Sequence, residues 1–134
     1  MLWNHSYETG VDEIDRQNLD MVSRLCAMIN PDASTVRFEQ LVNFELIVPR
    51  YFEREGVIHD ECGYYDADMH KFTHESCLQY LRKIKRNFID RGPTLENEMI
   101  FVNDALMSLR THIMDHDKPF AEFYRRNFKN AETH

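Results

Sequence analysis

The sequence predicts an all-α fold, namely an antiparallel, up-down-up-down four-helix bundle with an N-terminal arm and a short C-terminal helix. The chain has 134 residues, which suits one domain over residues 1–134. Only four glycines and four prolines occur, and this favours long regular elements over a loop-rich β fold. Four long segments repeat apolar residues at spacings of three and four, and helices of this kind with short connections form bundles.

The arm covers about residues 1–11, and the first helix is expected over about 12–29. The apolar positions of this helix share one face: Ile14, Met21, Val22, Leu25, Met28 and Ile29. The helix should end at Asn30, because a residue that precedes a proline is disfavoured in the α region.

Three further helices and a terminal one follow at short intervals. The second is expected over about 36–60, and Pro49 inside it should bend the helix because it removes one backbone hydrogen bond. The third is expected over about 66–90 and the fourth over about 95–115. A terminal helix at about 119–127 should dock through its aromatic residues.

Composition excludes several functions. The chain has 16 basic and 23 acidic residues and a net charge of −7, so it lacks the basic surface that nucleic-acid binding needs. No apolar run approaches the roughly 18–20 residues of a membrane span, and the polar N-terminus does not fit a signal peptide. We therefore expect a cytoplasmic protein with neither a nucleic-acid nor a membrane partner.

The sequence also lacks the usual signatures of catalysis. Its three cysteines are scattered without CxxC spacing, which disfavours a disulfide framework or a thiolate zinc site. No Ser-His-Asp order, glycine-rich phosphate loop or Cys-His pair stands out. We predict a non-enzyme, with weak oxidase or peroxidase activity as the one activity that an open metal position would allow.

Histidines lie on the inward faces of two helices. His70 and His74 are four residues apart, so their imidazoles share one face of the third helix. On the fourth helix, His112 is followed four residues later by His116 and five residues later by Asp117. Ideal helical geometry favours the pair His112/His116, whereas His112/Asp117 requires the helix to tighten or fray near its end.

The second helix adds Glu55 to the same interior, with His59 one turn later. A buried carboxylate is costly unless it is paired or bound to metal. An ion-pair network would need cations, yet no Lys or Arg lies on these inward faces. Imidazole and carboxylate without thiolate suit iron or manganese, and zinc less specifically. The predicted metal ligands are His70, His74, His112, Glu55 and Asp117.

These motifs resemble the hemerythrin family, and specifically its single-domain bacterial members. The resemblance runs from Trp3 to about Phe123, in the family's order of segments. It is carried by Trp3, the Thr9–Asp15 segment, Tyr51-Phe52-Glu53-Arg54-Glu55, Gly63-Tyr64, His70-x-x-x-His74 and His112-Ile113-x-x-x-Asp117.

The resemblance implies a non-haem di-iron site. It assigns one iron to the three histidines His70, His74 and His112 and makes Glu55 and Asp117 the bridging carboxylates. It assigns the second iron to two further histidines, and the matching positions in this chain are Asn18 and Tyr51. Both substitutions therefore fall on the same iron, the one that supplies the open position for dioxygen in the family.

An amide oxygen is a weak ligand for iron, and a tyrosine must first lose a proton that titrates near about 10. Two interpretations follow. In the first, one metal remains, Tyr51 donates its hydroxyl hydrogen to a carboxylate of the site, Asn18 fills space, and His59 is a satisfied or solvent-reaching histidine. In the second, a rearranged two-metal site recruits Tyr51 together with His59 or His116.

We expect a hemerythrin-like, non-haem metal-binding protein whose second metal position is degenerate. Iron is the expected cofactor, one ion rather than two, with zinc or manganese as substitutes. The first alternative is a di-iron bacteriohemerythrin that binds or senses dioxygen or another small diatomic ligand. The second alternative is a metal-free bundle that acts through an unidentified protein partner.

Overall fold

The computed structural model describes residues 5–29 and 34–129, without the side chains of 34–38 and 128–129. Every regular element in these residues is helical, which confirms the all-α prediction. The four long helices are α1 (Asp12–Ala27), α2 (Ser34–Glu61), α3 (Ala67–Arg91) and α4 (Leu95–His112). A short 3-10 helix, η1 (His5–Tyr7), precedes them. Trp3, on which part of the family resemblance rests, lies outside the described residues.

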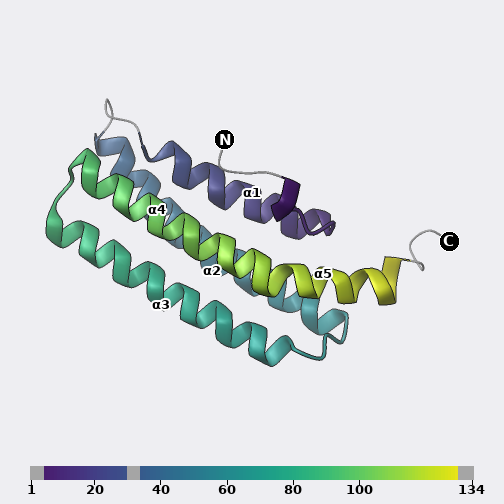
Figure 1. Cartoon of the computed structure of the whole chain (residues 1–134). Coiled ribbons are helices and arrows are strands. Elements are labelled where there is room, and N and C mark those ends of the chain that lie inside the picture. Colours follow the sequence, from purple (N-terminus) through teal and green to yellow (C-terminus); the bar gives the residue numbers. More distant parts are fainter. Residues whose placement is uncertain (1–4, 30–33, 130–134) are drawn as a thin grey trace.

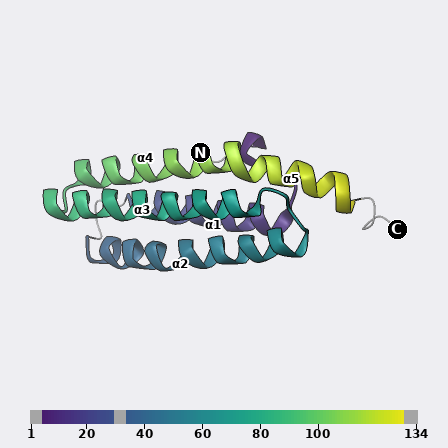
Figure 2. The ribbon, with the colours of Figure 1, turned by 90° about the horizontal axis from the view of Figure 1, so that it is seen from below.

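The four long helices lie side by side (Figures 1 and 2). α1 and α3 each contact both α2 and α4, so the four helices enclose a common core. Two apolar clusters fill it. The larger cluster draws residues from all four helices, including Leu25, Phe44, Leu81 and Leu109. The smaller cluster lies near the end of α2 and consists of Val11, Ile14, Ile58, Tyr64, Phe120 and Ala121.

The C-terminal part differs from the expectation of two helices separated by a break. α4 continues directly into a π-helical turn, η2 (Ile113–Asp117), then into α5 (Lys118–Tyr124) and a second π-helical turn, η3 (Arg125–Lys129). In η2 the Lys118 N–H donates to the Ile113 carbonyl, five residues earlier. Pro119 is the second residue after this turn and has no N–H to offer an α-helical bond. A widened turn lets the helix pass this proline without ending.

The N-terminal arm is fastened to α1 by one carboxylate. Asp15 accepts hydrogen bonds from the Thr9 N–H and hydroxyl, both at 2.8 Å, and from the Gly10 N–H at 3.0 Å. Gly10 has a φ of +90°, a conformation that suits a residue without a Cβ. The Arg125 guanidinium donates to the Thr9 carbonyl and so ties the arm to η3.

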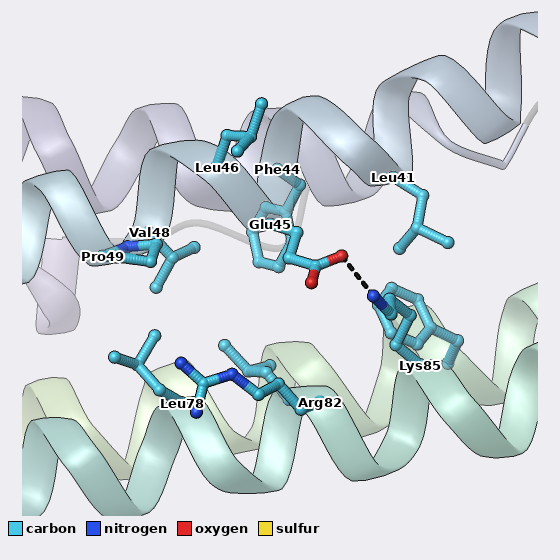
Figure 3. A pocket seen from close by; sticks show the side chains of 11 residues that line it. Leu41, Phe44, Glu45, Leu46, Val48, Pro49, Leu78, Arg82 and Lys85 are labelled. Carbon is cyan, nitrogen blue, oxygen red and sulfur yellow. Dashed lines mark hydrogen bonds and ion pairs between the residues drawn. The ribbon is translucent and has the colours of Figure 1, made fainter.

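α2 continues through Pro49 as one helix. A cavity of about 130 Å³ lies beside this proline, between α2 and α3 (Figure 3). Its walls are largely apolar, with Val48 and Leu78 among them, and at its rim the Lys85 ammonium contacts the Glu45 carboxylate at 2.6 Å. The two charges of this pair therefore neutralise each other. None of the predicted metal ligands lines the cavity.

Within the described residues, no helix combines the length and the apolar character that a membrane crossing requires.

Candidate metal centre

The five predicted ligands come together in the structure. Each offers one nitrogen or oxygen atom, and these atoms all lie within 4.8 Å of one another. All five side chains are buried, and they come from four successive elements: Glu55 from α2, His70 and His74 from α3, His112 from the end of α4, and Asp117 from η2. This group is called the five-residue cluster below.

The spacing of the five-residue cluster matches that of atoms bound to one ion. Glu55 Oε1 lies 2.7 Å from His70 Nε2 and 3.4 Å from His74 Nε2. Asp117 Oδ1 lies 3.1 Å from His112 Nε2 and 3.3 Å from His70 Nε2. Metal–nitrogen bonds of about 2.0–2.1 Å place neighbouring octahedral ligands about 3 Å apart and opposite ones about 4 Å apart. The observed distances fall within or close to that range.

Hydrogen bonds leave several atoms of the cluster unsatisfied. His74 Nε2, Glu55 Oε1 and Asp117 Oδ1 are buried and have no hydrogen-bond partner. Buried polar atoms are nearly always hydrogen-bonded, because an unmet one costs about 1–3 kcal/mol. The carboxylate oxygens and the imidazole nitrogens approach one another without aligned hydrogen atoms, which is how ligands facing a common cation lie.

Asp117 reaches the cluster through the π turn. In an α-helix a residue five positions after His112 would lie on a different face, and ideal spacing therefore favoured His116. The i to i+5 pattern of η2 returns Asp117 to the face of His112 and buries it completely. The expectation that the helix must tighten or fray was wrong, because the turn widens instead. His116 is only partly buried, and its ring centre lies 5.3 Å from that of His112.

Asn18 of α1 contacts the cluster from outside. It is buried, and its amide Nδ2 donates a hydrogen bond of 3.1 Å to Asp117 Oδ2. Asp117 therefore presents Oδ1 to the histidines and Oδ2 to the amide. Asn18 does more than fill space, since it fixes the orientation of one carboxylate.

Tyr51 does not donate to a carboxylate of the cluster, and that expectation was wrong. Its hydroxyl donates to Asp20 Oδ2 of α1 at 2.5 Å, and Arg24 donates to the same oxygen at 2.9 Å. Burial alone would raise the pKa of Asp20, but the hydrogen bonds from Tyr51 and Arg24 lower it below its ordinary value. Burial and the bond to Asp20 raise the pKa of Tyr51, so the phenol keeps its proton.

His59 is neither satisfied nor solvent-reaching, contrary to expectation. It is 0% exposed, and neither of its ring nitrogens has a hydrogen-bond partner. Its Nε2 lies 3.6 Å from Glu55 Oε1, and its ring centre lies 4.2 Å from that of His70. Its other neighbours are aromatic, with the Phe120 ring centre 4.2 Å away. His59 therefore borders the five-residue cluster on the side of α5.

Apolar groups surround the cluster and keep its electrostatic interactions strong. The Phe52 ring stacks on His74 with centres 4.1 Å apart and planes within 4°. The buried thiol of Cys77 lies 3.4 Å from the Ser108 hydroxyl, and burial raises its pKa, so it stays a protonated thiol. All three cysteines are free thiols.

Two surface grooves reach histidines of the cluster. One, of about 440 Å³ between α2 and α3, ends on His74 and Phe52. The other, of about 270 Å³ between α3 and α4, ends on His112, and His116 and Cys77 also line it. Its remaining walls carry several hydroxyl groups, from Thr73, Ser76, Tyr80, Ser108 and Thr111. Small solutes therefore have two routes toward the buried imidazoles.

The imidazoles supply the cations that balance the carboxylates. Burial would raise the pKa of Glu55, but the contacts of His112, His70 and His74 lower it well below its ordinary value. Against the effect of burial, Asp117 and Glu55 raise the pKa of His70, and they raise the pKa of His112 to about 10. Burial lowers the pKa of His74.

The contacts with Glu55 and Asp117 therefore favour the protonated form of His70 and of His112. Every ion pair that Glu55 and Asp117 form within the described residues is with an imidazole, and none is with Lys or Arg. Imidazole binds a metal only after losing the proton from the ligating nitrogen. A divalent cation and two protons therefore compete for the same atoms.

No protein-family model matches the chain, and neither the curated proteins nor the solved structures contain a significant match to it.

Proposed function

We propose that this chain is a hemerythrin-like, non-haem metal-binding protein that carries one metal ion. Its helices would form an antiparallel, up-down-up-down bundle, with the ion on His70, His74, His112, Glu55 and Asp117. The observation that carries the proposal is the convergence of five buried ligand atoms, three of which have no hydrogen bond. The family resemblance in sequence supports the same five residues.

The surroundings of Asn18 and Tyr51 support one ion rather than two. These residues stand where the resemblance places the two histidines of a second iron. The Asn18 amide is engaged by Asp117, and the Tyr51 hydroxyl is engaged by Asp20. With its pKa raised, Tyr51 cannot readily become the phenolate that would bind iron. Neither residue replaces a lost imidazole.

The donor set favours iron, with manganese or zinc as substitutes. It offers three imidazole nitrogens, which must lose their protons to bind a metal, and two carboxylate oxygens, and the neighbouring Cys77 remains a protonated thiol. Bound there, a metal would supply a Lewis-acidic centre with room for a small ligand, such as dioxygen or another diatomic molecule. The grooves that end on His74 and His112 support access of a molecule of that size.

The chain's own residues would hold and shield this centre. Asn18 orients Asp117, Phe52 fixes the plane of His74 by stacking, and the aromatic residues beyond His59 exclude water. Such outer contacts set ligand orientation and tune metal affinity.

Metal analysis of the purified protein, combined with an absorption spectrum in air, tests the proposal. We expect close to one metal per chain and no spectrum of an oxo-bridged iron pair. Two irons per chain with that spectrum would favour the oxygen-binding alternative. Protein whose thermal stability does not respond to iron(II), manganese(II), zinc(II) or chelator would favour the metal-free alternative, because a ligand specific for the folded state raises its stability.

A further inference from the structure

The proposed five ligands leave one buried imidazole without a role. His59 is 0% exposed, and both of its ring nitrogens lack a hydrogen-bond partner. A neutral imidazole carries one N–H donor and one lone pair, and burying both unmet is expensive.

His59 lies beside the metal centre, although it is not one of the five residues whose ligand atoms all lie within 4.8 Å of one another. It follows Glu55 by one turn of α2 and lies on the same face. Glu55 Oε1 has four histidine Nε2 atoms around it: His70 at 2.7 Å, His74 at 3.4 Å, His59 at 3.6 Å and His112 at 3.9 Å. The nitrogen of His59 is thus closer to this oxygen than that of His112, which belongs to the five-residue cluster.

We propose that His59 is a fourth histidine ligand of the metal centre, contributing Nε2 beside Glu55 and His70, and that it competes with a small ligand for the position that the five-residue cluster leaves open. The assignment rests on the proposed metal-binding function and extends it. His59 would approach the ion from the side of α5, where its ring centre lies 4.2 Å from that of Phe120. A bond to metal would also satisfy one of the two buried ring nitrogens of His59 that have no hydrogen-bond partner.

His116 supplies a matched control. It is the other histidine near the cluster, with ring centres 5.3 Å from His112 and 5.9 Å from His70. Unlike His59, it is only partly buried, and it lines the groove between α3 and α4. An imidazole that reaches a groove can bind water, so its position needs no metal to explain it.

The test compares His59→Phe with His116→Phe in the full-length protein. Phenylalanine keeps a planar ring beside Phe120 and removes both nitrogens. Each variant is titrated with iron(II) and with cobalt(II) in competition with a chromophoric chelator, and the cobalt absorption bands report the coordination. Thermal unfolding is recorded with and without metal.

For His59→Phe we expect a metal-free protein at least as stable as the wild type, because an apolar ring replaces unmet polar atoms. We expect its Kd for either metal to rise at least tenfold, its stabilisation by metal to shrink, and its cobalt bands to change. His116→Phe should match the wild type in all three. A purely structural His59 would shift the stability of the metal-free protein and leave the bands unchanged.

Unchanged affinity and unchanged cobalt bands in His59→Phe would overturn the assignment of His59 while leaving the five-residue site intact. If His59→Phe does not fold, His59→Leu gives the same comparison with a smaller side chain. A wild-type protein that binds neither metal would overturn the proposed function itself, which separates the two failures.

Discussion

The Asn18 amide donates to Asp117 Oδ2 at 3.1 Å, across 99 positions of sequence, while Asp117 Oδ1 faces His112 at 3.1 Å. One carboxylate is thus shared between a hydrogen bond from α1 and the interior cluster. Outer partners of this kind hold a ligand in the orientation that a metal needs. The contact makes α1 part of the centre although α1 contributes none of the five ligands.

Replacing Asn18 with leucine should weaken metal binding without unfolding the protein. Leucine has a similar size but cannot donate to Asp117, so the carboxylate loses its fixed orientation. We expect a 10- to 100-fold rise in Kd, of about the size seen for other outer partners, measured by chelator competition. Asn103→Leu, at an exposed position of α4, is the control and should bind like the wild type. Equal affinity in both variants would show that the contact does not orient the ligand.

Restoring two histidines should restore a second metal. In the double variant Asn18→His, Tyr51→His, both positions that the family resemblance assigns to the second iron carry imidazole again. We expect the metal content to rise from about one to about two ions per chain, with the absorption of an oxo-bridged iron pair. A double variant that still binds one ion would place the cause elsewhere in the scaffold, and the passage of α2 through Pro49 would be the first region to test.

Metal affinity should increase with pH. The carboxylates raise the pKa of His112 to about 10, so near neutral pH a metal must displace its proton. Each displaced proton strengthens apparent binding by about tenfold per pH unit below that pKa. We therefore expect the Kd for zinc(II) to fall steeply between pH 6.5 and 8.5, and the medium to acidify on binding. A Kd independent of pH across this interval would contradict the raised pKa.

The stability of the metal-free protein should change in the opposite sense. A raised pKa means that protonated His112 stabilises the fold, fully so below the ordinary histidine pKa of about 6.5. This contribution is lost as the pH rises through about 10. Urea unfolding between pH 7 and 10.5, compared with His112→Gln, isolates it from other groups that titrate there. The difference between the two proteins should shrink with rising pH.

Tyr51→Phe should lower the stability and leave metal binding unchanged. It removes the hydroxyl that donates to Asp20 at 2.5 Å, so we expect a loss of about 1 kcal/mol in the free energy of unfolding. Tyr80→Phe, which alters a more exposed tyrosine of α3, is the control. Metal titration of the same samples should give identical affinities. Weaker metal binding in Tyr51→Phe would instead favour a rearranged site that includes this phenol.

Helical periodicity predicted the all-helical fold and the inward positions of Glu55, His70, His74 and His112, because inward faces can be recognised from spacing. Periodicity could not predict the π turn, because the pattern of an α-helix assumes 3.6 residues in every turn. Pro119, two residues after Asp117, is the signal in the sequence that the helix departs from regular geometry here. A proline does not by itself indicate whether the turn tightens or widens.

The partners of Tyr51 and His59 were not predictable for a different reason. Tyr51 lies one turn before Glu55, and this spacing favours a hydrogen bond to a carboxylate of the site. In the structure the Tyr51 hydroxyl donates instead to Asp20 of α1, which Arg24 also contacts. His59 is buried because two aromatic rings pack against it. Phe120 is distant in the sequence, and Tyr64 lies beyond the turn that follows α2. Contacts between helices decide both outcomes.

The π turn also determines the sequence interval between two ligands that share one helix face. Asp117 stands five positions after His112 and still shares its face, because η2 accommodates one residue more than a regular turn would. In an ordinary α-helix, a carboxylate on that face would stand three or four positions after the histidine. A histidine and a carboxylate can therefore share one helix face at an interval of five residues when a π turn lies between them.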